Sequence, residues 1–372
     1  FVTGSLVHGG AERHTIGLAN RLAERGHECH FVYVKADHSQ FDRLRVTGQC
    51  LEAQRYLHPA ALRALQGVVQ EKKPHCIVAA NQYALMYAAL ARGGVPLMAT
   101  FHTTQLRSVK EALQMVYYRP LFWAAERLVF VCEAQRRYWR RRALFGRRTE
   151  VIYNGIDTEY WQAGQEGPAM RRALGFGEQD LVIGMSAVLR AEKNHLQMVD
   201  AIAMLRRRGV PARALLIGDG PLRGAVEARA RAAGVAEHVL ISGLQQDVRP
   251  LLAACDAAAL CSTAVETFSL AALEAMALGR PVVHAEIGGA AEMIRPWRDG
   301  LLFPVGDTHA LADCIAALAE APLRARMGAQ ARETVESMFS ERAMVDRYEA
   351  VLLELASTRS QREQVRRSAA AH

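Results

Sequence analysis

Two glutamates, Glu266 and Glu274, stand eight residues apart in the otherwise apolar stretch ETFSLAALEAM. Burying an unpaired carboxylate is costly, so such residues either point to water or face a cleft that takes a ligand. An ionised carboxylate only accepts hydrogen bonds, which makes the vicinal hydroxyl groups of a sugar suitable partners. The stretch therefore indicates a candidate site for a polyhydroxylated ligand.

A predicted strand precedes this stretch, and Ser269 is a good N-cap for the helix that follows. Glu266 then lies in the loop and Glu274 on the helix, so the two carboxylates do not share one face as a catalytic pair would. The first amides of a helix lack intrahelical partners and favour an anion. We expect the backbone amides of Phe268, Ser269 and Leu270 to bind phosphate between the two glutamates.

Two cations follow another predicted strand, in the segment SAVLRAEKNH. Arg190 and Lys193 stand there at the carboxyl end of the strand, where positive charge would stabilise a departing diphosphate. The alternative is a pair of surface cations at a helix start. The position at the mouth of a sheet favours a functional role.

Several other ligand motifs are absent or incomplete. IGDGPLRG resembles a dinucleotide fingerprint, but after Gly218 and Gly220 the third glycine position holds Arg223, and Gly224 comes one residue late. The sequence has no G-x-x-x-x-G-K-[ST] motif and no D-x-D that might hold a metal against a diphosphate. We expect no nicotinamide site, no P-loop, no metal and no cofactor.

The composition is that of a globular protein, with 372 residues, 51% of them hydrophobic and 23% charged. No run reaches the roughly 18 apolar residues of a membrane span. The seven cysteines are scattered without a C-x-x-C pair, so we expect reduced thiols in a cytoplasmic protein, with neither a disulfide framework nor a zinc site. The chain opens without Met in what resembles the second half of a strand, and we expect a few residues to precede it.

Basic residues are concentrated in one segment of a chain whose net charge is +8. Seven arginines lie in the segment Arg136–Arg148, RRYWRRRALFGRR, together with Tyr138 and Trp139. A basic helix with interfacial aromatics could contact an anionic membrane or an anionic acceptor. The alternative is a solvated helix that only aids solubility. A nucleic-acid partner is not expected, because the excess is local and no nucleic-acid module accompanies it.

Short apolar runs alternate with helix-length segments throughout, which predicts an α/β fold with parallel sheets. A helix is predicted over 11–26, ending at Gly26 as its C′ residue. The predicted strands are 1–6, 27–34, 75–80, 96–102, 127–132 and 149–154 in the first half, and 181–188, 213–220, 238–243, 257–262, 281–286 and 301–306 in the second.

A Gly-rich and polar segment after the Asn154-Gly155 turn marks a boundary between two domains. We assign residues 1–160 to an N-terminal domain, 161–340 to a C-terminal domain, and 341–372 to a helix and polar tail. The last helix is predicted to run from Ser340 to about Ala356, with a frayed tail after it. Two α/β halves leave a cleft between them, and such sheets bind ligands at the carboxyl ends of their strands.

The motifs GSLVHGGAER, RGHECHFV, TFHTTQ, VIYNGID, LRAEKNH, LLIGDGPLR, ISGLQQDV, ETFSLAALEAMALGRPVV and GGAAEMI occur in this order. With these motifs the chain resembles a family 4 glycosyltransferase of the GT-B fold. The most specific part of the resemblance is the pair of glutamates with seven residues between them. The resemblance implies two Rossmann-like parallel-sheet domains that face each other across a cleft. The first would select the acceptor and the second would bind the nucleotide-sugar donor.

Roles for the donor-side residues follow from the resemblance. It implies that Glu274 holds the ribose hydroxyls, that Glu266 contacts the hydroxyls of the transferred sugar, and that Lys193 neutralises the phosphates. From the first domain, the loop of Gly9 and Gly10 would close on the diphosphate. His102, in TFHTT, would lie beside the donor sugar; the alternative for it is a core or turn histidine.

One motif departs from the family pattern. Many members read G-R-L-x-x-x-K, whereas alignment on Lys193 places Ala187, Val188 and Leu189 at the first three positions. The usual phosphate-binding arginine is therefore missing at Val188. Arg190 could take its place, and the sequence leaves this open.

The resemblance implies a retaining, metal-independent transferase that moves a hexose from a nucleoside-diphosphate sugar to an acceptor hydroxyl. It needs no side-chain nucleophile, because the departing phosphate helps to deprotonate the acceptor. A lipid-linked or cell-surface glycan, such as lipopolysaccharide or capsule, is the expected acceptor, with the protein in the cytoplasm or peripheral on the inner membrane face. Two alternatives are a nucleotide-sugar epimerase of the same fold and a non-catalytic membrane-associated subunit.

Overall fold

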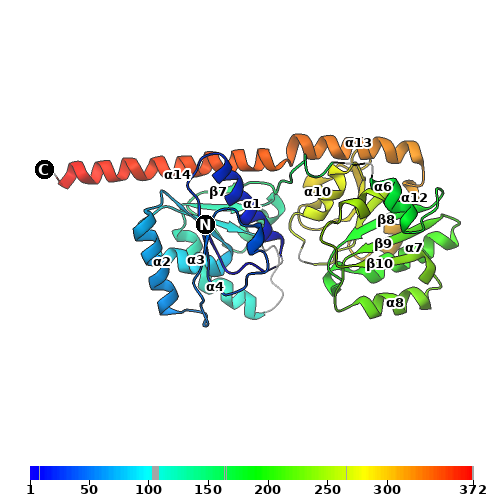
Figure 1. Ribbon diagram of the computed structural model, residues 1–372, viewed down its shortest axis with the longest axis horizontal. Helices are drawn as coiled ribbons and strands as arrows, with labels where there is room; N and C mark the ends of the chain where they lie inside the picture. Colours follow the sequence, from blue (N-terminus) through cyan, green and yellow to red (C-terminus); the bar gives the residue numbers. More distant parts are fainter. Residues whose placement is uncertain (8, 103–108, 163, 165, 265, 371–372) are drawn as a thin grey trace. The chain divides into compact units, whose positions relative to one another are not determined.

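The computed structural model describes residues 1–7, 9–102, 109–162, 164, 166–264 and 266–370, with side chains up to 357 except those of 110 and 112. By packing, the chain divides into two units. Unit 1 comprises Phe1–Asn154 and Ala343–His372, and unit 2 comprises Gly155–Arg342. Each unit has one parallel sheet covered by helices (Figure 1), so the predicted α/β class is confirmed.

The sheet of unit 1 has seven described strands in the order β3-β2-β1-β4-β5-β6-β7. The edge strand β3 was not predicted, because its sequence TGQC is polar and half of its residues are exposed. The other strands fall within the predicted segments. The strands are β1 (Val2–Thr3), β2 (His30–Tyr33), β3 (Thr47–Cys50), β4 (Ile77–Ala80), β5 (Leu97–Phe101), β6 (Arg127–Phe130) and β7 (Thr149–Val151).

Helices cover both faces of this sheet, because its central strands are apolar on both sides. Val78, Met98 and Val129 pack against α1 and α14, whereas the alternate residues Ala79 and Ala99 pack toward α2, α3, α4 and α5. The predicted end of the first helix is confirmed, since Gly26 has a φ of +92°. The helices are α1 (Gly10–Glu24), α2 (Pro59–Lys72), α3 (Asn81–Ala91), α4 (Val109–Ala124), α5 (Glu133–Arg140) and α14 (Glu341–Ala370).

The last helix is longer than predicted. It was expected to end near Ala356, but α14 continues to Ala370. The added segment contains neither Gly nor Pro and is rich in Arg, Gln, Glu and Ala, which are good helix formers. Within unit 1, Val345, Tyr348 and Val351 of α14 are buried against the sheet.

The sheet of unit 2 has six described strands in the order β10-β9-β8-β11-β12-β13, all within the predicted segments or one residue from them. The strands are β8 (Leu181–Ser186), β9 (Ala212–Ile217), β10 (Val239–Gly243), β11 (Ala257–Leu260), β12 (Val282–Ala285) and β13 (Gly300–Phe303). The helices are α6 (Glu166–Ala173), α7 (His195–Arg207), α8 (Arg223–Ala232), α9 (Arg249–Ala253), α10 (Leu270–Ala277), α11 (Ala290–Met293), α12 (Thr308–Ala317) and α13 (Ala321–Met338).

The two ends of unit 2 lie side by side. The amide of Ile156 donates to the carbonyl of Phe339 at 3.0 Å, and the amide of Glu341 donates to the carbonyl of Ile156 at 2.7 Å. A Cβ on Gly155 would lie 2.5 Å from the carbonyl oxygen of Ser340, which is too close for any side chain. The glycine of the Asn154-Gly155 turn is therefore required by this close approach.

Candidate active site

The strand order of unit 2 reverses between β8 and β11, which are neighbours in the sheet although β9 and β10 separate them in the sequence. Ligands of open α/β sheets bind at the carboxyl ends of the strands that flank such a reversal. Lys193 ends the short 3-10 helix η2 (Ala191–Lys193) after β8, and Glu266 lies in the loop after β11. The topology therefore brings two predicted site residues to one edge of the sheet.

Lys193 and Glu266 form an ion pair, with Nζ 2.6 Å from Oε2. The hydroxyl of Ser262 donates to the same carboxylate oxygen at 2.9 Å. Glu266 has only 8% of its surface exposed, and these partners offset its lost hydration. Burial favours the neutral acid, but Lys193, the buried His284 and the hydrogen bonds outweigh it and hold the pKa of Glu266 below its ordinary value. Glu266 is therefore ionised at neutral pH.

A glycine pair fixes the backbone beneath Glu266. Gly288 has a φ of +60°, and a Cβ there would lie 2.0 Å from the carbonyl oxygen of Glu266. The amide of Gly289 donates to the carbonyl of Thr267 at 2.7 Å. The GGAAEMI motif therefore lets the loop after β12 lie directly against the loop that carries Glu266.

A second glycine pair fixes the segment that leads to Lys193. A Cβ on Gly218 would lie 2.2 Å from the carbonyl oxygen of Ala187, and one on Gly220 would lie 2.7 Å from that of Leu189. The amide of Leu189 also donates to the carbonyl of Asp219 at 3.0 Å. The glycines of IGDGPLRG thus allow close backbone packing beside Lys193, which explains them without a dinucleotide.

The helix after Glu266 begins as predicted. Ser269 is the N-cap of α10, and its hydroxyl accepts from the amide of Ala272 at 3.3 Å. Phe268 is buried, with its ring centroid 5.3 Å from that of Phe339. Glu274 lies inside α10 with 4% of its surface exposed. The loop and helix placements of the two glutamates are confirmed, whereas phosphate and ribose binding there stay predictions.

His102 follows β5 at the carboxyl edge of the unit 1 sheet and is half-buried. The ring of His14, on α1, lies 4.9 Å from the ring of His102 between centroids, and His14 Nε2 is 3.3 Å from the hydroxyl of Tyr348. Desolvation lowers the pKa of His102 to about 4. Desolvation, with His102 as a neighbour, also places the pKa of His14 well below its ordinary value. Both rings are therefore neutral at pH 7.

Gly9 and Gly10 begin α1 after β1. Gly9 is the N-cap in an extended conformation, and Gly10 is the first residue of the helix. A Cβ on Gly9 would lie 2.3 Å from Oε2 of Glu12, whose pKa is raised by burial. His8 and residues 103–108, which include the last three residues of the TFHTTQ motif, lie outside the described residues. Diphosphate binding by Gly9 and Gly10, and the proximity of His102 to a sugar, stay predictions.

Two family descriptions match the chain in succession. Glycosyltransferase Family 4 matches residues 8–160, and Glycosyl transferases group 1 matches residues 167–334, so that together they span most of the chain. The chain belongs to the family 4 glycosyltransferases.

Curated relatives of this chain are similar to it over part of their length. N-acetyl-alpha-D-glucosaminyl L-malate synthase of Bacillus anthracis is 32% identical over 203 residues, 54% of this chain and 52% of the relative. Lipopolysaccharide core biosynthesis glycosyltransferase LpsE of Rhizobium meliloti is 34% identical over 134 residues, 36% of this chain and 39% of the relative. The chain spans about half the length of the first of these relatives and less of the second.

Solved structures are similar over nearly the whole chain. Alr3699/HepE of Anabaena, solved in complex with UDP, has a TM-score of 0.84 and 23% identity, and the match covers 95% of this chain and 99% of that one. At this identity the likeness defines the fold. The predicted GT-B fold is confirmed, with a Rossmann-like parallel sheet in each unit.

Arg190 lies three residues before Lys193 in the sequence. It is the N-cap of η2, and its side chain is exposed. Val188, at the position of the family arginine, is 47% exposed. Arg190 thus lies on the same short segment as Lys193 with its side chain exposed to solvent. Its contact with phosphate stays a prediction.

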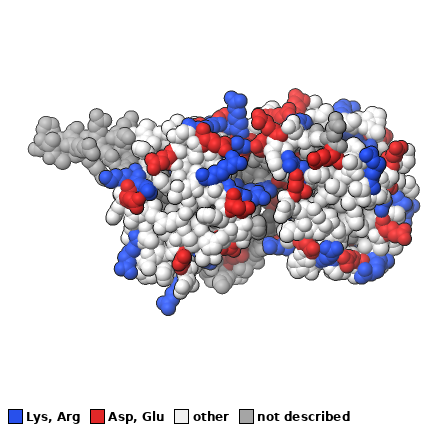
Figure 2. Space-filling view, viewed as in Figure 1, with Lys and Arg blue, Asp and Glu red and all other residues white. Residues whose placement is uncertain are grey.

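Part of the arginine-rich segment is engaged within unit 1. Arg136 lies 2.7 Å from Glu133, and Arg148 lies 2.8 Å from Glu354. The expectation of two interfacial aromatics is wrong for Trp139, which is 1% exposed because it fills the core between α5 and the sheet. Figure 2 shows Lys and Arg mixed with Asp and Glu on the face that it displays. None of the described helices is both long and apolar enough to cross a membrane.

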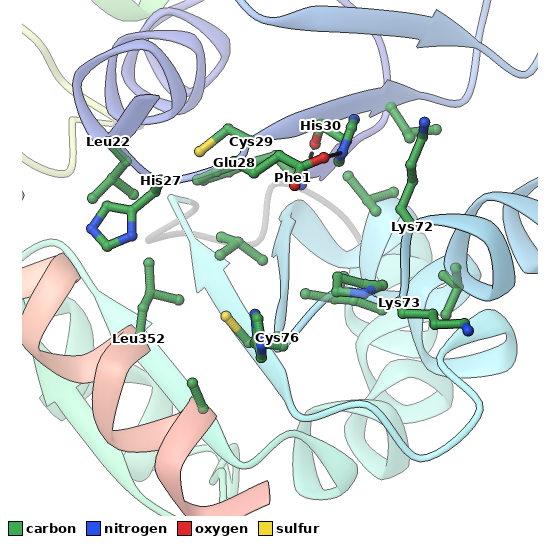
Figure 3. A pocket seen from close by; sticks show the side chains of 18 of the residues that line it. Phe1, Leu22, His27, Glu28, Cys29, His30, Lys72, Lys73, Cys76 and Leu352 are labelled. Atoms are coloured by element: carbon green, nitrogen blue, oxygen red, sulfur yellow. Dashed lines mark hydrogen bonds and ion pairs between the residues drawn. The ribbon is translucent and has the colours of Figure 1, made fainter. Parts of the chain in front are cut away.

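A cavity of about 370 Å³ opens at the other edge of the unit 1 sheet (Figure 3). Phe1, Cys29 and Cys76 line it beside the amino ends of β1, β2 and β4. Burial raises the pKa of Cys76 to about 11, so this thiol is protonated and a poor nucleophile. His102 follows the carboxyl end of β5, and the cavity is therefore no part of the candidate site.

Several residues of the candidate site were not predicted from the sequence. His14 continues the helical series of Leu18 and Leu22, both buried, and this spacing could have placed it on the inner face of α1. His284 is a lone polar residue in the apolar strand β12. Ser262 gave no signal, because a serine at a strand end is common. Among the described residues, no three His, Cys, Asp or Glu side chains gather as metal ligands would.

Proposed function

We propose that this protein is a retaining, metal-independent glycosyltransferase that moves a hexose from a nucleoside-diphosphate sugar to an acceptor hydroxyl. The observation that supports this most is the ion pair of the half-buried Lys193 with the buried Glu266 at the strand reversal of unit 2. The pair places a cation, which can bind phosphate, beside a carboxylate, which can accept hydrogen bonds from hydroxyl groups. In a nucleotide sugar, the phosphates and the sugar hydroxyls lie next to each other in the same way.

Charge stabilisation would supply most of the rate enhancement. The bond between the sugar and the diphosphate breaks, and negative charge grows on the leaving oxygen. Lys193, the first amides of α10 and Arg190 would offset it in a site that is already arranged. The leaving phosphate would accept the acceptor's proton on the same face of the sugar, which retains the anomeric configuration. No side chain has to act as a nucleophile.

His102 would act as a neutral hydrogen-bonding group beside the sugar. Because its pKa is about 4, its ring carries no charge at pH 7. The ring of His14 packs against it, and Tyr348 in turn contacts His14. We propose that His14 positions His102 and does not itself touch the substrate.

The proposed acceptor is a lipid-linked or cell-surface glycan, and the proposed place of work is the inner membrane face. LpsE of Rhizobium meliloti is named for lipopolysaccharide core synthesis, which supports a glycan acceptor. The exposed arginines of the segment Arg136–Arg148 support contact with an anionic membrane. A UDP-sugar donor is supported by the UDP complex of Alr3699/HepE.

The donor is tested first by thermal shift with UDP, GDP and ADP and their sugars. The true donor nucleotide should raise the melting temperature with increasing concentration, by mass action. A flat response to all of them would remove the donor site. The donor sugar is then incubated alone and followed by NMR. A new epimer would favour the epimerase alternative, and binding without turnover on any glycan acceptor would favour a non-catalytic subunit.

A further inference from the structure

Helix α4 exposes large apolar side chains along its length. The exposed fractions are 78% for Val109, 67% for Leu113, 54% for Val116, 66% for Tyr117 and 47% for Trp123. Isolated exposed apolar residues are common on protein surfaces, but a contiguous set on one helix marks an interaction surface. We name these five residues the α4 stripe.

Helical geometry places the α4 stripe on a single face. Its members follow one another at intervals of one, three, four or six residues between Val109 and Trp123, which keeps them within about a third of the helix circumference. Met115, Tyr118 and Phe122 lie on the opposite face and are buried in the core of unit 1. A helix that is apolar on both faces needs a second partner outside its own core.

An exposed tyrosine and leucine from a neighbouring loop extend this surface. Tyr56 is 49% exposed, and burial together with the neighbouring Tyr117 of the α4 stripe raises its pKa. Leu57, next in sequence, is 48% exposed. Tyr and Trp favour the boundary between the headgroups and the acyl chains of a bilayer.

The arginine-rich segment lies beside α4 on the same face of the sheet. Phe122 of α4 and Trp139 of α5 both pack on Phe101, each with 5.1 Å between ring centroids. The amide of Arg147 donates to the carbonyl of Ala125, just after the end of α4, at 3.4 Å. Apolar and cationic surfaces are therefore adjacent.

The charges of this neighbourhood are mostly positive. Arg137, Arg140, Arg141 and Arg147 are exposed. Glu133 pairs with Arg136 at 2.7 Å, and Glu126 pairs with Arg92 at 2.8 Å and with Arg147 at 3.7 Å. An apolar helix face flanked by arginines is typical of segments that lie in the interface of an anionic membrane.

We propose that α4 docks unit 1 on an anionic bilayer, with the α4 stripe in the headgroup boundary and the adjacent arginines on lipid phosphates. The proposal rests on the proposed work at a membrane, but it assigns the apolar half of the contact to α4. Charge complementarity favours an anionic bilayer over a second copy of this chain, because two copies would bring arginines together.

Flotation with vesicles tests this directly, with the full chain and no donor. Phosphatidylcholine vesicles that contain phosphatidylglycerol should bind the protein, and pure phosphatidylcholine vesicles should bind it much less. The triple variant Leu113→Gln, Tyr117→Gln, Trp123→Gln should lose on the order of tenfold or more in vesicle affinity. The control Leu353→Gln changes a leucine of α14 that is 55% exposed and should bind as the wild type does.

Unchanged circular dichroism and an unchanged thermal shift with nucleotide show that the triple variant is folded. Equal vesicle binding by the triple variant and the wild type overturns the proposal, as does a wild type that binds no anionic vesicle. A mass by light scattering that doubles for the wild type and not for the variant would assign the α4 stripe to self-association. Turnover on a soluble acceptor, measured separately, tests the proposed transferase without a membrane.

Discussion

Lys193 is the side chain through which the proposed chemistry acts most directly, because it touches Glu266 and would face the diphosphate. Lys193→Met keeps most of the aliphatic stem and removes the charge. We expect turnover to fall on the order of a hundredfold or more, since the cation acts on charge that grows in the transition state. Glu266 would keep the Ser262 hydrogen bond but lose its main counter-charge. Its pKa would rise, and the acid limb of the pH dependence of kcat would move to higher pH.

Lys72→Met is the matched control for this substitution. Lys72 ends α2 and pairs at the surface with Glu71 at 2.8 Å, outside the candidate site. Its removal should leave kcat and the pH profile unchanged. A Lys193→Met enzyme with kcat within a few-fold of the wild type would contradict the role of the ion pair.

The positions of the site residues in a loop or a helix could be predicted from the sequence, whereas their contacts could not. The stretch ETFSLAALEAM predicted a loop position for Glu266 and a helix with Ser269 as its cap, because N-cap chemistry is local. The pairing of Glu266 with Lys193 joins segments 73 residues apart and depends on the strand order, which no local pattern specifies. The packing of His14 on His102 and Tyr348 depends on tertiary structure in the same way.

Gly288 allows the loops after β12 and β11 to lie against each other. Gly288→Ala would force a left-handed φ on a side chain and place its Cβ against the carbonyl of Glu266. The φ alone should cost about 1 kcal/mol of stability. The displaced loop should lower kcat by on the order of tenfold or more, because Glu266 would move out of its geometry. Denaturant unfolding and steady-state kinetics measure the two effects.

Gly306→Ala is the control that separates the effect of backbone strain from the effect of displacing the loop. Gly306 has a φ of +81°, but a Cβ there meets nothing within 4 Å. This variant should lose similar stability and keep its kcat. If both variants keep full turnover, the glycine at 288 does not position Glu266.

Helices and strands could be predicted where their burial leaves a recognisable pattern of apolar residues in the sequence. The central strands are apolar on both faces and were found, whereas the polar edge strand β3 was not. The end of α14 was misplaced because polar composition was interpreted as fraying, although the segment has high helix propensity. The α4 stripe was overlooked for the opposite reason, since apolar residues all round a helix hide the usual amphipathic signal.

The two units use the same arrangement, in which site candidates follow the carboxyl ends of parallel strands. Gly9, Gly10 and His102 follow β1 and β5 in unit 1, and Lys193 and Glu266 follow β8 and β11 in unit 2. This part of the architecture could be predicted from alternating strands and helices. Each unit also holds buried, neutral histidines near these edges, which links the whole molecule's stability to pH.

Acidification should destabilise both units through these histidines. Burial lowers the pKa of His102 in unit 1 and of His195 in unit 2 to about 4, from an ordinary 6.5. Between these values the unfolded chain binds protons that the folded chain does not, so the free energy of unfolding falls as the pH falls through this window. From pH 6.5 to pH 5 the loss should be about 1.6 kcal/mol for each histidine.

His195→Leu tests how much of the acid-induced loss of stability comes from unit 2. His195 is 1% exposed, and neither ring nitrogen has a hydrogen-bond partner among the described residues, so leucine should be tolerated at neutral pH. Denaturant unfolding at pH 7 and pH 5 should then show a smaller fall for the variant than for the wild type, because its unfolded state gains no proton there. An equal fall in both proteins would mean that His195 titrates normally in the folded chain. The acid sensitivity would then belong to other groups.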